Sequence, residues 1–157
     1  MVDIGDDAPD FTAPLANGTV ETFTLSDHLD EAPIVLAFFP AAFTGTCTTE
    51  MCTFRDQLAQ FEDVGATVYG VSVDLPFTLN EFRRQNDLNF GLISDERREL
   101  IAAYDVADTF SPCEMRVAQR SVFVVDGDGT VTYTWRGSPK DQPDYEAVRE
   151  AAAEAHS

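Results

Sequence analysis

The chain has 157 residues, of which 44% are hydrophobic, and its 28 acidic and 10 basic residues give a net charge of −18. This length fits one domain with a single core over residues 1–157, and the hydrophobic content argues against a disordered chain. The strong negative charge makes nucleic acid and anionic membrane poor partners. The acids are spread along the whole chain, which predicts a solvated acidic surface rather than an acidic tail.

The basic residues and the N-terminus suggest where such a protein works. Lys140 is the only lysine, and this scarcity beside so many acids predicts an origin in a salt-loving microbe. Residues 1–7 have neither the basic region nor the apolar core of a signal peptide, and no apolar run has transmembrane length. We therefore expect a cytoplasmic protein. Three cysteines in such a protein indicate redox or metal chemistry rather than a structural disulfide framework.

The first 30 residues predict an extended arm and an edge strand. Residues 3–14 contain two prolines and show no clear hydrophobic period, so we expect an extended arm. Asn17-Gly18 signals a hairpin turn, and alternation over residues 19–25 predicts an edge strand. One helical turn is expected at residues 26–29.

Two buried strands, each followed by a helix, are predicted in the centre of the chain. Six consecutive apolar residues at 34–39 and a second apolar run at 66–73 predict strands that are buried on both faces. Apolar residues at spacings of four and three from Cys47 to Phe61 predict an amphipathic helix. A shorter helix is expected at residues 77–85.

The remaining elements complete an α/β pattern. A parallel crossover followed by a hairpin predicts a central mixed β-sheet flanked by helices, with the N-terminal β-arm as an extension. The further expected elements are a brief strand at 89–93, a helix at 95–104 capped by Ser94 or Asp95, an irregular loop at 105–119, strands at 121–125 and 130–135 around a hairpin turn, and a helix at 144–155.

Cys47 is the strongest candidate for a reactive residue. It lies in the first turn of a helix that follows a buried strand, where backbone N–H groups lack intrahelical partners and the helix dipole is positive. This field favours the thiolate, which is the nucleophilic form of cysteine. Thr44 and Thr46 place hydroxyl groups nearby. The alternative is a small apolar cysteine packed in the core.

Cys52 follows Cys47 by five residues. In an intact helix their Cα atoms would lie roughly 8.6 Å apart, from a rise of about 1.5 Å and a turn of about 100° per residue. A disulfide requires less than about 7 Å. The two residues can therefore bond only if the first helical turn unwinds. Reactive thiols often use a neighbouring cysteine as the resolving group, and the alternative is a surface or interhelix cysteine with no partner.

The motif around Cys47 resembles the active site of peroxiredoxins. Pro40, Thr44 and Cys47 match the family's Pro-x-x-x-Thr-x-x-Cys motif, and Glu50 and Arg120 match its acidic and arginine positions. The resemblance extends over nearly the whole chain. Residues 38–47 are similar to the alkyl hydroperoxide reductase E branch, whereas the second cysteine is similar to the bacterioferritin comigratory protein branch.

The resemblance implies a thioredoxin-like fold and the reduction of hydrogen peroxide and organic hydroperoxides. It implies that Cys47 becomes a sulfenic acid, condenses with Cys52 into an intrachain disulfide, and is recycled by thioredoxin. Arg120 would stabilise the developing charge, Thr44 and the Cys47 N–H would orient the peroxide, and Pro40 would shield the sulfenic acid. A homodimer through the loop at Phe43 also agrees with the family.

Several alternatives remain open from the sequence. Arg120 could form an ordinary surface ion pair, Thr44 could only cap the helix, and Glu50 could be placed by the helix dipole alone. Cys113 could be a second resolving cysteine, an intermolecular partner or an idle thiol.

The function also has alternatives. One is a one-cysteine peroxiredoxin with an external resolving thiol, and another is a peroxide-oxidised redox sensor or holdase. His28 and His156 stand alone and there is no Cys-x-x-Cys, so we expect neither a metal site nor a cofactor.

Overall fold

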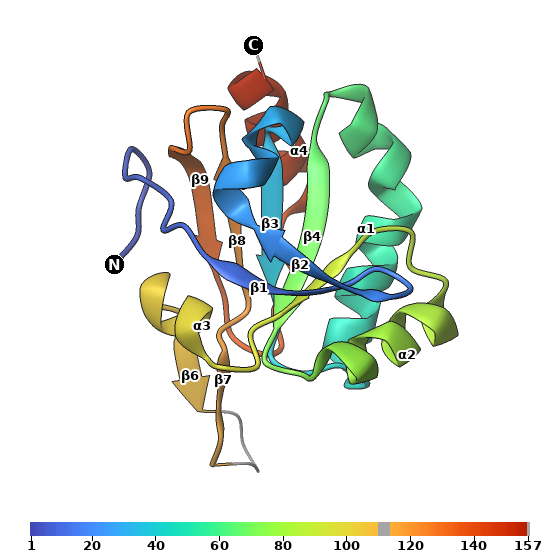
Figure 1. Cartoon of the computed structure of the whole chain (residues 1–157). Helices are drawn as coiled ribbons and strands as arrows, with labels where there is room; N and C mark the ends of the chain where they lie inside the picture. The colour runs from blue at the N-terminus through green and yellow to red at the C-terminus, as the bar shows by residue number, and fades with distance from the viewer. Residues whose placement is uncertain (110–113, 157) are drawn as a thin grey trace.

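The computed structural model describes residues 1–109 and 114–156 (Figure 1). The strands are β1 (Thr12–Ala16), β2 (Val20–Thr24), β3 (Ile34–Phe38), β4 (Thr67–Ser72), β5 (Leu92–Ser94), β6 (Ala107–Thr109), β7 (Arg116–Ala118), β8 (Ser121–Val125) and β9 (Val131–Arg136). The helices are η1 (Leu25–Glu31), a 3₁₀ helix, and α1 (Gly45–Asp63), α2 (Pro76–Asn86), α3 (Glu99–Ala103) and α4 (Tyr145–His156).

Within the described residues, seven strands form one mixed sheet in the order β2-β1-β5-β4-β3-β8-β9. The parallel strands β3, β4 and β5 form its centre, and the remaining pairings are antiparallel. Because the crossovers that join parallel strands pass over a face of the sheet, the centre is covered on both sides. The sheet with flanking helices confirms the predicted α/β fold. The end of the predicted N-terminal arm forms part of β1, and the predicted edge strand is β2 at one edge of the sheet.

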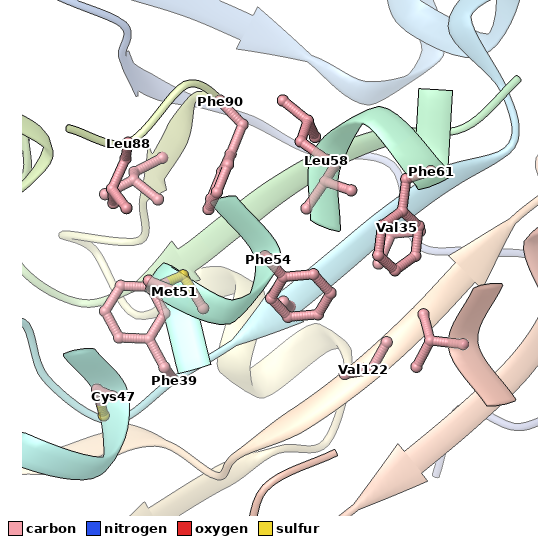
Figure 2. Packing of buried hydrophobic residues seen from close by; sticks show 14 of the residues in the cluster. Val35, Phe39, Cys47, Met51, Phe54, Leu58, Phe61, Leu88, Phe90 and Val122 are labelled. Carbon is pink, nitrogen blue, oxygen red and sulfur yellow. The ribbon is translucent and has the colours of Figure 1, made fainter. Parts of the chain in front are cut away.

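Alternate residues of β3 face two separate cores. Val35 and Ala37 pack with α1, α2 and α4 on one face, whereas Ile34, Leu36 and Phe38 pack with η1 and α3 on the other. Figure 2 shows the first core, in which the apolar side of α1 lies over β3. This side consists of Cys47, Met51, Phe54, Leu58 and Phe61. The start of α1 is thus fixed by packing against the sheet.

The prediction of an irregular loop at residues 105–119 is wrong for its described part. β6 and β7 pair antiparallel in a separate two-stranded sheet, with Ala107 opposite Ala118 and Thr109 opposite Arg116. Each strand has three residues, so neither shows enough alternation to be recognised from the sequence. Cys113 lies outside the described residues.

The predicted helix at 95–104 is shorter than expected, since α3 begins at Glu99. Its N-cap residue is Arg98 rather than Ser94 or Asp95. The Asp95 carboxylate nevertheless accepts hydrogen bonds from the N–H groups of Leu100 and Ile101 at 3.0 and 2.9 Å. The other predicted strands and helices agree with the structure within a few residues. No helix of the described residues combines the length and the apolar character that a membrane crossing requires.

Candidate active site

A buried strand delivers the chain to the candidate site. β3 ends at Phe38, Pro40 is buried two residues later, and α1 begins at Gly45. Between them Phe43 has a positive φ of 67°, an uncommon backbone conformation for a bulky residue. This turn directs the chain into α1, so that Cys47 lies in the first turn as the sequence predicts.

The Cys47 sulfur is buried beside a cation. Its side chain is 1% exposed, and its Sγ accepts a hydrogen bond from Arg120 Nη2 at 3.1 Å. Figure 2 shows Cys47 at the start of α1, one turn before Met51. Arg120 directly precedes β8, which pairs with β3, and the sheet therefore brings together two residues that are 73 positions apart. The guanidinium thus places a fixed planar donor directly against the sulfur.

Arg120 and Glu50 form a buried ion pair. Arg120 is 1% exposed and Glu50 is fully buried, and Arg120 Nη1 donates to Glu50 Oε1 at 2.5 Å. The alternative of an ordinary surface pair for Arg120 is therefore wrong. Arg120 Nη2 also donates to the carbonyl of Pro139 at 2.9 Å. These contacts fix the guanidinium plane against the sulfur, since bonds to three groups leave it little freedom.

Burial changes the protonation of Glu50. Removal from water raises the pKa of the Glu50 carboxyl to about 7, and the charge of Arg120 only partly opposes this effect. Glu50 Oε2 and Arg120 Nε are buried without a hydrogen-bond partner among the protein groups described. The site is thus dry and strongly charged, and its carboxyl titrates near neutral pH.

Thr44 is the N-terminal cap residue of α1, but its side chain does not cap the helix. Its Oγ1 donates to the carbonyl of Ala41 at 2.7 Å, which leaves the oxygen lone pairs available as acceptors. The alternative of a simple capping role is therefore wrong for Thr44. The first α-helical bond at this end runs from the Thr48 N–H to the Thr44 carbonyl at 2.9 Å, so the Cys47 N–H belongs to the unpaired first turn.

Cys52 lies on a different side of α1 from Cys47. Five residues turn a helix by about 500°, which places the two side chains about 140° apart around its axis. Cys52 is half-buried, and its Sγ lies 3.8 Å from Asn86 Oδ1 at the end of α2. Both cysteines are free thiols. The interhelix position matches one alternative for Cys52, and the structure holds it apart from Cys47.

Sequence reasoning missed the groups that hold this site from outside. Asp74 Oδ2 accepts a hydrogen bond from the Ala42 N–H at 2.8 Å, and Gln142 Nε2 donates to the Thr46 carbonyl at 3.0 Å. The sequence marks Asp74 only as the end of a strand, and nothing in it distinguishes Gln142 from other polar residues. No cluster of three or more metal-ligating side chains occurs within the residues that the structure describes.

Comparison with known proteins identifies the family. The sequence model of the AhpC/TSA family matches residues 4–134. The chain belongs to the AhpC/TSA family. It is 41% identical over 130 residues to a putative peroxiredoxin of Mycobacterium tuberculosis, covering 81% of this chain and 80% of that protein. It is 36% identical to peroxiredoxin Bcp of Bacillus subtilis over 138 residues, covering 86% of this chain and 85% of that protein.

Solved structures give the same result. The fold matches the crystal structure of peroxidoxin BcpB from Mycobacterium tuberculosis with a TM-score of 0.84 and 30% identity, over 99% of this chain and 98% of that one. The predicted peroxiredoxin family, thioredoxin-like fold and cysteine-dependent peroxidase activity are thereby confirmed.

Proposed function

We propose that the chain reduces hydrogen peroxide and organic hydroperoxides at Cys47 and resolves the product through Cys52. The observation that carries this proposal is the placement of Cys47, which is 1% exposed in the first turn of α1 with its Sγ 3.1 Å from Arg120 Nη2. The nucleophilic sulfur of Cys47 is therefore buried away from water and lies beside the fixed cation of Arg120. Such a site favours attack by sulfur on a weak O–O bond.

In the first step the Cys47 thiolate attacks one peroxide oxygen. An S–O bond forms, the O–O bond breaks, and the departing oxygen leaves as hydroxide or alkoxide that takes up a proton. Negative charge moves from sulfur onto oxygen during this step. Arg120 stabilises the negative charge both on the sulfur and on the oxygen, because its guanidinium is already oriented by Glu50 and by the Pro139 carbonyl.

The peroxide would be oriented by groups of the first turn. Since Thr44 Oγ1 already donates to the Ala41 carbonyl, it can accept a hydrogen bond from the peroxide O–H. The unpaired N–H of Cys47 can donate to the other peroxide oxygen. Pro40 is buried in the preceding loop, where it would keep water from the sulfenic acid.

In the second step the Cys52 thiolate attacks the Cys47 sulfenic acid. An S–S bond forms, the S–O bond breaks, and hydroxide leaves and is protonated to water. Because the two cysteines face different sides of α1, the first turn must unwind before this reaction. A dithiol protein such as thioredoxin would then reduce the disulfide by exchange. We propose that the protein is a single domain and that these reactions take place in the cytoplasm.

We also propose that the protein forms a homodimer through the surface at Phe43. Phe43 lies in the loop between β3 and α1 and is 48% exposed, although its ring contacts Phe82 edge-on at 5.2 Å between centroids. Burial of such a ring against a second copy would remove apolar area from water. Sedimentation of the parent and of Phe43→Ser would test this interface through a shift from dimer to monomer.

The mechanism is tested by intact mass and peptide mapping after one equivalent of hydrogen peroxide. We expect the parent to lose about two mass units, mapped to a Cys47–Cys52 disulfide, because one bond replaces two thiol hydrogens. Cys52→Ser should instead gain about sixteen units on Cys47, as a trapped sulfenic acid. Cys113→Ser is the matched control and should behave as the parent.

Two other outcomes identify the alternatives. Unchanged multiple turnover with thioredoxin in Cys52→Ser indicates a one-cysteine enzyme whose resolving thiol is external. Consumption of one peroxide equivalent per chain, despite excess reductant, indicates a redox sensor or holdase. The first result would overturn the resolving role of Cys52, and the second would overturn catalytic turnover. An unmodified Cys47 would overturn the proposal as a whole.

A further inference from the structure

We propose that Asp74 and Gln142 act as two clamps on residues 42–46 and thereby set how fast Cys47 leaves the active site to meet Cys52. The inference rests on the proposed resolving role of Cys52. Asp74 and Gln142 are positioning residues, because each acts on the backbone beside Cys47 and neither contacts its sulfur in the hydrogen bonds of the site.

The first clamp holds the loop before α1. Asp74 Oδ2 accepts from the Ala42 N–H at 2.8 Å and from Ser72 Oγ at 2.7 Å. A carboxylate acceptor makes the bond to the backbone stronger than a neutral one. Ala42 lies between Pro40 and Thr44, so this bond fixes the loop that carries both.

The anchor of this clamp is rigid. Asp74 follows β4 in the centre of the sheet, and its carbonyl accepts from Ser94 Oγ, at the end of the parallel strand β5, at 2.6 Å. Ser72 and Ser94 are fully buried. Movement of the loop must therefore break its bond to Asp74, because the strand ends that hold Asp74 cannot follow.

The second clamp holds the first turn of α1 itself. Gln142 Nε2 donates to the Thr46 carbonyl at 3.0 Å, and Gln142 Oε1 accepts from the Tyr145 hydroxyl in the first turn of α4. Thr46 is bonded directly to Cys47, so its carbonyl moves whenever the cysteine is carried toward Cys52. Unwinding of the turn thus requires the loss of this bond as well.

These bonds matter because two reactions compete for the sulfenic acid. A second peroxide can attack the sulfenic acid only while the first turn of α1 is intact, and it oxidises the sulfur irreversibly to sulfinic acid. Cys52 can attack the sulfenic acid only after this turn has unwound. If unwinding is an unfavourable equilibrium before disulfide formation, each clamp lowers the resolution rate by the factor it contributes to that equilibrium. The conformation with an intact first turn remains dominant, so the first reaction with peroxide is little affected.

The test compares Asp74→Ala and Gln142→Met with two matched controls. Asp126→Ala also removes a carboxylate that accepts backbone N–H bonds, from Asp128 and Thr130 at 2.9 Å. Asp126 follows the end of β8 that lies away from Arg120 and the active site. Gln57→Met removes a side chain that bonds α4 to α1, through Arg149 at 2.7 Å, but outside the first turn. Asp74→Asn keeps an oxygen acceptor at the clamp and should restore most of the parent behaviour.

Stopped-flow kinetics should separate the two chemical steps. In each clamp variant we expect disulfide formation to be about threefold to tenfold faster, as the loss of one hydrogen bond allows. The yield of sulfinic acid at high peroxide, measured by mass, should fall by a similar factor. The first reaction with peroxide should change less than about twofold. A general loss of structure would slow both steps instead.

Hydrogen exchange of the reduced protein tests the clamps without using Cys52. Amides in a peptide covering residues 42–50 should exchange about threefold to tenfold faster in both clamp variants, and not in the controls. Unchanged exchange, or faster exchange with an unchanged resolution rate, would overturn the proposal. Faster exchange in a protein that forms no Cys47–Cys52 disulfide would support the clamps and overturn the resolving role of Cys52.

Discussion

Cys47 and Cys52 lie five residues apart on one helix, yet their surroundings have little in common. Cys47 is 1% exposed and receives a hydrogen bond from a buried guanidinium. Cys52 is half-buried between α1 and α2, and its hydrogen-bond partner is the neutral amide of Asn86. The helix alone produces this contrast, because a turn of about 140° directs one sulfur to β8 and the other to α2.

The contrast shows how one helix can hold two thiols with different tasks. The first turn has unpaired N–H groups and a positive dipole, and here it also has the only arginine that contacts a cysteine in the hydrogen bonds of the described residues. One turn further, the N–H groups are satisfied by the helix and the dipole field has fallen.

The largest effect should come from the sulfur atoms themselves. Cys47→Ser should abolish peroxide reduction, a loss of at least about 10⁴-fold, because serine has no comparable nucleophile at neutral pH. Cys52→Ser should leave the first reaction with peroxide within about twofold of the parent, since Cys52 does not contact Arg120 in the site described. Single-turnover kinetics measures both. Equal losses in the two variants would show that Cys47 and Cys52 do not have different tasks.

The next largest effect should come from the cation. Arg120→Lys keeps the charge but cannot bond Cys47, Glu50 and Pro139 from one fixed plane. We expect the rate constant of the first step to fall about 10²-fold. Alkylation of Cys52 should be unchanged in the same variant, and a parallel decrease there would indicate a disturbed helix rather than a lost transition-state contact.

A third effect should appear in stability against pH. The folded-state pKa of Glu50, about 7, lies above its ordinary value of 4.5 because of burial. Folded protein therefore binds this proton more tightly, and the resulting stability is fully present below about pH 4.5 and is lost as the pH rises through 7. Relative to Glu50→Gln, the parent should lose on the order of 3 kcal/mol across this interval.

Urea unfolding of both proteins at a series of pH values, in constant salt, measures that difference. The comparison isolates Glu50 because the other 27 acidic residues, from a total of 28, are shared by both chains. A constant difference between pH 4 and 8 would contradict the raised pKa of Glu50.

The smallest effect should be that of salt on the first step. We propose that the acidic surface is an adaptation to concentrated salt, in which a net charge of −18 is screened. Raising potassium chloride from about 0.1 to 2 M should raise the denaturation midpoint because the Debye length falls to about 3 Å or less. The rate of Cys47 with neutral hydrogen peroxide should change less than about twofold, since buried pairs are screened little. A large rate change would place Cys47 in contact with solvent ions.

The sequence predicts the elements that have a long apolar run or a regular apolar spacing. β3 is a continuous apolar run, and α1 carries five apolar residues at helical spacing, so both their type and their position follow from period alone. The placement of Cys47 in the first turn follows from the order of these two elements. The three-residue strands β6 and β7 have no such period and were predicted as loop.

Only some residues of the candidate site could be predicted from the sequence. Burial of Arg120 could not be inferred from its type, because arginine is normally exposed, and only resemblance to the family directed attention to it. Asp74 and Gln142 contact backbone atoms 32 and 96 positions away. Hydrogen bonds of this range leave no pattern in the chain, since any acceptor or donor at that place in the fold would serve. They become visible only when the topology is known.

The near-complete burial of Cys47 has a consequence for chemical labelling. The sulfur of a cysteine that is 1% exposed is reached by a molecule as small as hydrogen peroxide more readily than by a bulky sulfenic-acid reagent. Such a reagent reacts only after the surrounding turn has opened, so the label that it leaves reports the frequency of opening and not the amount of oxidation. Proteome surveys with bulky probes would therefore undercount the oxidised form of this protein, and small probes or direct mass measurement would recover it.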